Sequence, residues 1–152
     1  MANLINTTEN ADIPMTKNEQ SLINIIVEMV IDRNEIYVNV TNSIEKFINI
    51  CLKYKVIYGM ETIEIAMLYF HKINVNKFLL QYSTYYIFVV CMIIASKNLE
   101  DSSYDNRTFS KLSNLNLQNI NHLECEFLKA FDFNITLIRD KNDLMNEVKL
   151  LL

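Results

Sequence analysis

The stretch Phe78–Asp101, FLLQYSTYYIFVVCMIIASKNLED, decides the fold of this chain. Its first nineteen residues, 78–96, are uncharged, and Lys97 is its first charged residue. A helix that is apolar on all sides has to be enclosed by protein or by lipid. The length is close to the roughly 20 residues that cross a bilayer, but hydroxyl side chains interrupt the stretch and no Lys/Arg-rich flank adjoins it. We interpret it as the central helix of a helical bundle rather than a membrane span, with Lys97 near the negative end of the helix dipole.

The composition predicts an all-α protein that forms one domain. The chain has 152 residues, of which 51% are hydrophobic, and this is enough for a sizeable core. It contains one glycine and one proline, so almost nothing within it breaks a helix. The net charge of −4 and the lack of clustered Lys and Arg argue against a nucleic-acid partner, because phosphate contacts need such clusters.

The three cysteines indicate the compartment. Cys51, Cys91 and Cys125 lie far apart among apolar residues, and none belongs to a CxxC or Cys–His pattern. We expect all three to be buried free thiols in a reducing environment. The first residues show no basic-then-apolar signal pattern. Together these features predict an intracellular protein of the cytoplasm, the nucleus or both.

Apolar residues at helical spacing predict helices joined by short turns. A polar, flexible arm covers 1–17, and the expected helices are 19–31, 44–54, 62–73, 78–101, 107–112, 117–131 and 144–151. The β-branched run 35–40 is interpreted as an extended connector, and Asn42 or Ser43 as the cap of the next helix. Gly59 is the expected left-handed helix stop. The predicted inward-facing residues of three helices are Ile44, Phe47, Ile48, Cys51 and Leu52; Ile63, Ala66, Met67, Phe70 and Ile73; and Leu117, Ile120, Leu123, Leu128 and Phe131.

The chain shows no pattern that is typical of an enzyme or of a metal or cofactor site. His71 and His122 fall in predicted helices without a triad-like arrangement of partners. His122 and Glu126 are four residues apart, but two ligands are too few for a metal. The acidic pair 100–101 can serve a metal or act as a general acid, although polar residues at a helix end are the commoner case. We therefore predict no catalytic residue, no metal and no cofactor.

Several runs of residues match the motifs of a known family in order and at similar separations. They are SIEKFINICLKY at 43–54, AMLYFHKI at 66–73, IIASKNLED from residue 93, YDN at 104–106, FSKL at 109–112 and LNLQNINHLECEFLKAFDFNITL at 115–137. These runs resemble the cyclin box, and within cyclins the single-box phosphate-pathway type, called P- or U-type. The resemblance spans about 22–137. It implies a five-helix cyclin box with an extra N-terminal helix over 18–137, followed by a short C-terminal helical tail, 138–152.

The chain departs from the family pattern at several positions. Tyr85 and Tyr86 replace a His-Arg pair of the family, and the range 113–114, Ser-Asn, replaces paired glycines. In the earlier helices, 71–72 is His-Lys instead of Asp-Arg, and Asn49 replaces an arginine. The loss of the glycines affects one turn. The missing arginines put in doubt any role of these positions in binding anions or reading substrates.

The resemblance implies a regulatory subunit, not an enzyme, that binds a cyclin-dependent protein kinase and reorients the C-helix of the kinase. A lysine at the end of the third box helix and a glutamate in the fifth do this together in cyclins, and Lys97 and Glu124 are the matching residues. An apolar groove beside them receives a side chain of the kinase helix. The matching groove residues here are Ile94, Leu128, Phe133 and Ile135.

Two other interpretations of the same residues stay open. Without the resemblance, Lys97 and Glu124 are more commonly solvated surface charges, and apolar residues at helical spacing are more commonly core. The chain can also be a cyclin-fold adaptor that holds another protein and activates no kinase. If the groove residues are exposed, they allow self-association when no partner is bound.

Overall fold

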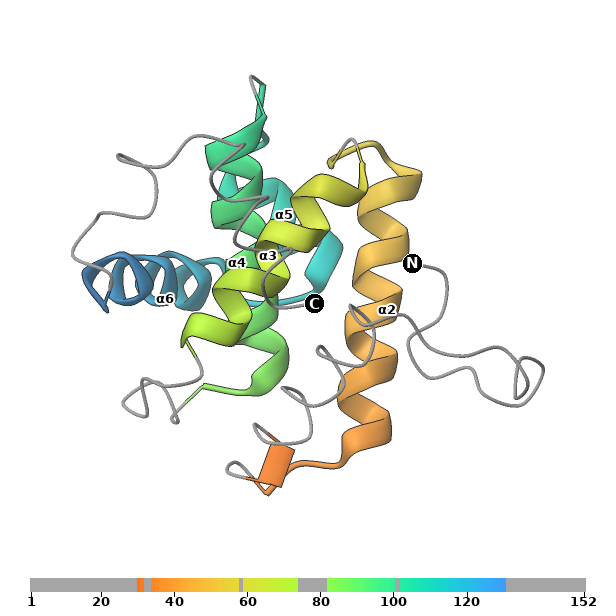
Figure 1. The fold of residues 1–152 in the computed structure, drawn as a ribbon, viewed down its shortest axis with the longest axis vertical. Coiled ribbons are helices and arrows are strands. Elements are labelled where there is room, and N and C mark those ends of the chain that lie inside the picture. The colour runs from red at the N-terminus through yellow and green to blue at the C-terminus, as the bar shows by residue number, and fades with distance from the viewer. Residues whose placement is uncertain (1–29, 32–33, 58, 74–81, 101, 131–152) are drawn as a thin grey trace.

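A computed structural model describes residues 30–31, 34–57, 59–73, 82–100 and 102–130 of the chain. Within these ranges it contains α-helices and no strand, as Figure 1 shows, so the all-α prediction is confirmed. The helices are α2 (Tyr37–Lys53), α3 (Met60–Ile73), α4 (Thr84–Leu99), α5 (Asn106–Ser113) and α6 (Leu117–Ala130). The predicted arm 1–17, the predicted tail 138–152, and the residues Phe133 and Ile135 lie outside the described ranges.

Helix α4 is the centre of the bundle, as its sequence predicts. All residues from 87 to 96 are buried, and α4 packs against α2, α3, α5 and α6. Its helical structure begins at Thr84, because the Ser83 hydroxyl caps it by accepting a hydrogen bond from the Tyr86 backbone N–H at 3.2 Å. The prediction of helix from residue 78 is therefore wrong for residues 82 and 83, and 78–81 lie outside the described ranges.

The length of α4 also bears on the membrane question. It has 16 residues, whereas a bilayer span needs roughly 20. Among the residues that the structure describes, no helix combines the length and the apolar character needed to cross a membrane. The uncharged surface of α4 is covered by the neighbouring helices instead (Figure 1).

Helix α2 begins earlier than predicted. The run 35–40 was expected to be an extended connector, but helix starts at Tyr37, and both proposed caps, Asn42 and Ser43, lie inside the helix. Val40 and Thr41 are buried one turn before Ile44 and extend its buried stripe toward the N-terminus. The helix propensity of a β-branched residue is unfavourable by less than about 0.7 kcal/mol, so the burial of this extra turn outweighs it.

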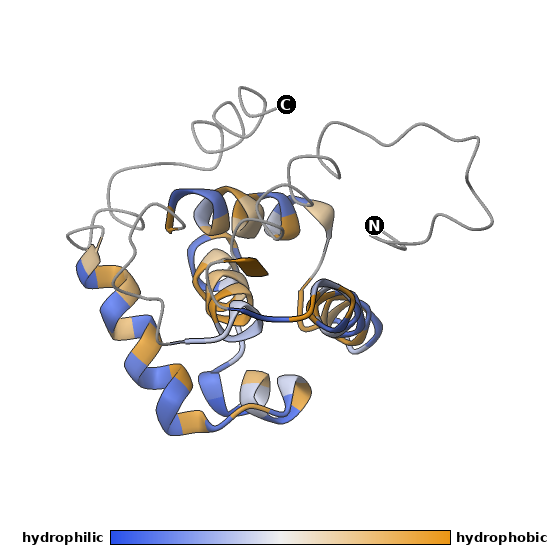
Figure 2. Cartoon of the chain, turned by 90° about the horizontal axis from the view of Figure 1, so that it is seen from below, coloured by the Kyte–Doolittle hydropathy of each residue, from blue (hydrophilic) through white to orange (hydrophobic). Residues whose placement is uncertain are grey.

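Helices α2, α3 and α6 each bury at least one row of side chains. On α2, the predicted inward residues are buried except Leu52, which is half-buried. On α3 all five predicted inward residues are buried, together with Ile65, Leu68 and Tyr69. On α6 the buried residues are Ile120, Leu123 and Phe127. Figure 2 shows the resulting pattern, with hydrophobic residues between the helices and hydrophilic residues on the outer faces of α2 and α6.

Several helix ends use left-handed backbone at residues other than glycine. Asn34, Lys55 and Asn114 have φ of 55°, 56° and 63°. In each case the N–H of the following residue bonds to the carbonyl five residues before it, at 3.0, 2.9 and 3.3 Å respectively. This is the Schellman arrangement that ends a helix. Gly59 does not have positive φ, so its predicted role as the left-handed stop is wrong, and Lys55 ends α2 instead.

The thiols are only partly as predicted. Cys51 and Cys91 are buried and free, but Cys125 is exposed on α6. Burial raises the pKa of the Cys51 thiol to about 12, and the charge of Glu100 adds to the effect. Burial also raises the pKa of Cys91 well above its ordinary value. Because the thiolate is the nucleophile, these two thiols are inert at neutral pH.

Candidate functional site

Lys97 and Glu124, which are 27 residues apart in sequence, meet at the surface between α4 and α6. The Lys97 Nζ donates to Glu124 Oε2 at 2.9 Å and to Oε1 at 3.3 Å. The lysine side chain is 37% exposed and the glutamate side chain 15%. The structure therefore brings together the two residues that the resemblance singled out. Of the two side chains, that of the lysine has the larger exposed fraction.

Two asparagines that sequence reasoning did not assign to the site adjoin the carboxylate: Asn106 contacts it directly, and Asn121 contacts Asn106. Asn106 Nδ2 donates to Glu124 Oε1 at 2.8 Å and to Asn121 Oδ1 at 2.8 Å. Both asparagines lie within the quoted motifs YDN and LNLQNINHLE, which the resemblance linked to a family but to no function. Nothing in the spacing of the residues indicates this contact, since Asn106 and Glu124 are 18 residues apart.

Local capping positions these side chains on the short helix α5 and on α6. Asp105 caps α5 by accepting from the backbone N–H of Thr108 at 3.0 Å and from its hydroxyl at 3.1 Å. These hydrogen bonds lower the pKa of the Asp105 carboxyl. Asn116 accepts from the backbone N–H of Asn119 at 3.1 Å and caps α6. The caps set where each helix begins and thereby which residues face the junction.

Two of the predicted groove residues flank the ion pair. Ile94 lies one turn before Lys97 on α4, and Leu128 lies one turn after Glu124 on α6, so each is on the same face as its charged neighbour. Leu128 is half-buried and packs on the core, whereas Ile94 is only 2% exposed. Ile94 therefore supports this surface from beneath. Phe133 and Ile135 lie outside the described residues, so the predicted groove stays a prediction.

The surface rests on a rigid junction of three helices. The rings of Tyr69 on α3 and Phe127 on α6 meet edge to face with centroids 6.1 Å apart. Asn98 Nδ2, next to the lysine on α4, donates to the Tyr69 hydroxyl at 2.9 Å. Such packing limits how far the backbone next to Lys97 and Glu124 can shift when a partner binds.

The remaining candidates do not form a site in the part of the chain that the structure describes. His71 and His122 are both exposed. Glu100 is half-buried at the end of α4, where it accepts a hydrogen bond from the Ser96 hydroxyl at 3.0 Å; Asp101 lies outside the described residues. The described His, Cys, Asp and Glu side chains include no group of three or more that could hold a metal ion.

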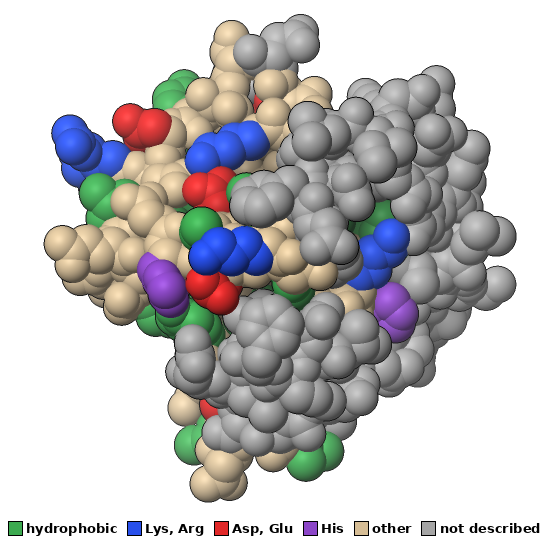
Figure 3. All heavy atoms as spheres, turned by 90° about the vertical axis from the view of Figure 1, so that its left-hand side faces the viewer, with side chains coloured by type: hydrophobic (Ala, Val, Ile, Leu, Met, Phe, Trp, Pro, Cys, Tyr) green, Lys and Arg blue, Asp and Glu red, His purple; other side chains and the backbone are tan. Residues whose placement is uncertain are grey.

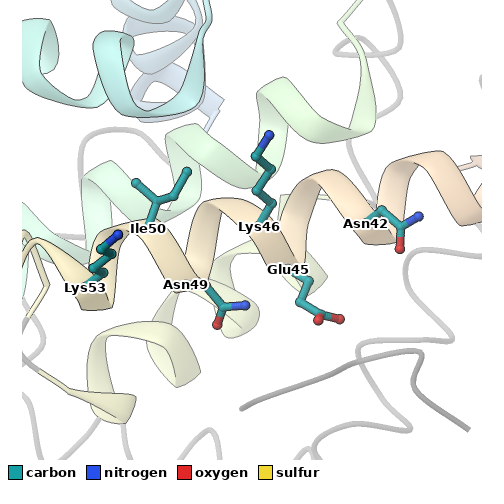
Figure 4. Close-up of a pocket in the computed structure, with 6 residues that line it drawn as sticks. All are labelled: Asn42, Glu45, Lys46, Asn49, Ile50 and Lys53. Atoms are coloured by element: carbon teal, nitrogen blue, oxygen red, sulfur yellow. The ribbon is translucent and has the colours of Figure 1, made fainter.

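Two hollows lie on or beside α2. The first has a volume of about 330 Å³, and its described lining comes from α2 only. Figure 4 shows Glu45 and Asn49 pointing away from Lys46 and Ile50, so the polar groups do not converge on one ligand. The second, of about 530 Å³, lies between α2 and α5, with Lys46 and Lys111 in its lining.

The surface charges are mixed rather than gathered by sign. Figure 3 shows basic and acidic side chains next to one another over the described part of one face. The described residues include two ion pairs between helical side chains, Lys97 with Glu124 at 2.9 Å and Lys129 with Glu126 at 3.6 Å. On the described part of this face, charges of both signs alternate rather than forming one continuous basic patch.

The structure defines an all-α module with an ion pair between α4 and α6. The comparison with family models identifies the module: the cyclin model matches residues 3–135, and the chain belongs to the cyclin family. Its role is accordingly that of a regulatory protein that acts through protein partners. Searches of curated proteins and of solved structures gave no match.

Proposed function

We propose that this chain is the regulatory subunit of a cyclin-dependent protein kinase, and that it activates the kinase by docking on its C-helix. The observation that carries the proposal is the contact of Lys97 with Glu124 at 2.9 Å between α4 and α6. The motifs of the chain favour a single-box P/U-type cyclin, with a role in the cell cycle or in nutrient signalling inside the cell. Phe133 and Ile135 complete the groove in this proposal.

The chemistry of the ion pair suits the binding of a helix. The Lys97 ammonium has three donors and the Glu124 carboxylate has several acceptor positions, and their mutual contacts do not use all of them. The free capacity can bind backbone groups of a partner helix that lies across α4 and α6. Each charge neutralises the other, so the partner does not bury a lone charge, which would cost several kcal/mol. Leu128 supplies the adjoining apolar contact, as in other helix-in-groove complexes.

The test compares this ion pair with a matched one on the same molecule. Lys97→Met and Glu124→Gln remove the charges of the proposed site, whereas Lys129→Met and Glu126→Gln remove those of the neighbouring pair on α6. Binding is measured by pull-down and titration with a panel of cyclin-dependent kinases. We expect the first two variants to lose about 2 kcal/mol or more of binding free energy, roughly 30-fold in affinity, and the second two to bind normally. Normal binding by all four variants would refute the proposal.

A second function, a cyclin-fold adaptor that activates no kinase, is favoured by one feature of α2. Asn49, which replaces an arginine of the family, lies beside the first hollow (Figure 4), so the chain has an amide there in place of a guanidinium. Peptide phosphorylation by the recovered complexes separates the two functions. An activator raises the rate of the bound kinase, and an adaptor binds without changing it. Light scattering of the chain alone tests self-association through the unoccupied groove.

A further inference from the structure

The side chain of Asn106 contacts Glu124, one of the two charged residues of the proposed docking site. Its amide nitrogen donates to Glu124 Oε1 and to Asn121 Oδ1, both at 2.8 Å. Its amide oxygen is buried and has no hydrogen-bond partner among the described residues. A buried acceptor without a partner costs stability and calls for an explanation. The two hydrogen bonds of the amide nitrogen therefore account for the position of this side chain, and the amide oxygen does not.

The two acceptors determine the orientation of the amide. If the amide of Asn106 were turned by 180°, its oxygen would face the oxygens of both Asn121 and Glu124 at hydrogen-bonding distance, which is repulsive. Only the observed orientation places donors against both oxygens. Asn121 thus keeps the amide of Asn106 turned so that a donor faces the carboxylate.

The orientation of the Glu124 carboxylate in turn depends on Asn106. The terminal torsion of a glutamate side chain is broad, so one contact does not fix it. Here Oε1 accepts from Asn106 and from Lys97, and Oε2 accepts from Lys97. These donors come from two different helices, α5 and α4. Without Asn106, the carboxylate is held only by Lys97, whose side chain is 37% exposed.

We propose that Asn106 is a positioning residue of the docking surface: it holds the Glu124 carboxylate in the orientation that the partner binds, and Asn121 holds the Asn106 amide. This inference rests on the proposed function. It predicts that a kinase binds more tightly when both Lys97 and Asn106 hold the Glu124 carboxylate than when Lys97 alone holds it. Asn106 itself does not need to touch the partner.

A double-mutant cycle tests whether Asn106 acts through Glu124. The probe is a cyclin-dependent kinase identified by co-purification with the full chain. We expect Asn106→Ala to lower its affinity about tenfold, the usual effect of losing a hydrogen bond to a charged group. In a Glu124→Gln background the same change is expected to lower affinity less than twofold, because the acceptor it positions is altered. Asn119→Ala, which removes an asparagine bonded to Tyr86, is the control and is expected to bind normally.

A second variant and a partner-free measurement cover the case in which Asn106→Ala folds poorly. Asn106→Asp keeps the shape but places an acceptor against the carboxylate, so it is expected to weaken binding more than Asn106→Ala does. In the free chain, the side-chain amide NMR signals of Asn106 are expected to shift on Glu124→Gln and to stay unchanged on Glu126→Gln.

The outcomes separate this inference from the proposed function. If Glu124→Gln weakens binding but Asn106→Ala and Asn106→Asp do not, the positioning role is overturned and the docking site stands. The positioning role is also overturned if Asn106→Ala costs the same affinity in both backgrounds, since a merely structural role would do this. If Glu124→Gln has no effect on binding, both the positioning role of Asn106 and the proposed docking site are refuted.

Discussion

The Tyr85 hydroxyl on α4 donates a hydrogen bond to the backbone carbonyl of Ser113, the last residue of α5, at 3.0 Å. The next residue, Tyr86, accepts one from the backbone N–H of Asn116 at 3.3 Å, at the start of α6. Between the two contacts lies Asn114, with left-handed backbone. Tyr85 and Tyr86, which replace the His-Arg pair of the family, therefore hold the turn between α5 and α6. The same turn contains Ser113 and Asn114, which replace the paired glycines of the family.

Tyr85→Phe is expected to destabilise the fold by about 1 kcal/mol, the net contribution of one hydrogen bond. The ring stays in place against Phe47, with which it packs edge to face at 6.2 Å, so the change isolates the hydroxyl. Urea unfolding measures the effect. Tyr54→Phe, at an exposed position, is the control. Equal stability of both variants and the unchanged chain would show that the contact with Ser113 contributes nothing.

The Tyr85 contact also has a pH dependence with a definite sign. Burial, with a smaller contribution from Cys51, raises the pKa of the Tyr85 hydroxyl to about 12. The folded state thus favours the neutral form, and this stabilisation is complete below the pKa of the unfolded chain, about 10. It is lost as the pH rises from there through the folded value. The stability difference between the chain and Tyr85→Phe should therefore be constant from neutral pH to about 10 and shrink above it.

Lys55→Gly is expected to stabilise the protein. Left-handed backbone costs a residue with a side chain roughly 1–2 kcal/mol, and glycine relieves this at an entropic cost of roughly 0.5–1 kcal/mol. The net gain is about 0.5–1 kcal/mol. Lys53→Gly, the same change two residues earlier within α2, is expected to destabilise by a similar amount, because glycine is unfavourable inside a helix. A loss of stability in both variants would mean that Lys55 does not need left-handed backbone.

Thiol labelling distinguishes the exposed cysteine from the buried ones. In the folded chain at pH 8, one thiol, Cys125, is expected to react rapidly with iodoacetamide. Cys51 and Cys91 should be protected by burial and by their raised pKa values. All three should react after unfolding in urea, which serves as the control. Rapid labelling of Cys91 in the folded chain would contradict the placement of α4 at the centre of the bundle.

The cap of α5 should make stability fall in acid. The pKa of Asp105 is lowered in the folded state, chiefly by the backbone N–H of Thr108. Its contribution is therefore complete above the pKa of the unfolded chain and is lost as the pH falls through the lowered folded value. Asp105→Asn keeps a good cap without the titrating charge. Thermal unfolding should show an advantage of aspartate over asparagine at neutral pH that disappears in strong acid; an advantage independent of pH would contradict this.

The interior of the fold was predictable where a pattern was long and the alternatives few. Nearly twenty uncharged residues can only be enclosed, and α4 is enclosed. The start of α2 was not predictable in this way. Its β-branched run 35–40 has the composition of a strand, and only the burial of Val40 and Thr41 against neighbouring helices shows that it continues the helix.

The residues of the candidate site were likewise predictable only in part. The resemblance selected Lys97 and Glu124 one at a time, and their contact at 2.9 Å agrees with that selection. Asn106 escaped notice because an asparagine just before the predicted helix 107–112 has a ready local interpretation as a cap or turn residue. The cap is in fact Asp105, which leaves the asparagine side chain to reach across to α6.

The amino-acid sequence by itself determined that this chain is helical, that one helix is enclosed and that it belongs among the cyclins, because these follow from composition, periodicity and motif order. Only the tertiary structure decided which polar side chains meet. A hydrogen bond needs its atoms within about 3 Å, and whether residues from α4, α5 and α6 come that close depends on how the helices pack, which no spacing along the chain records.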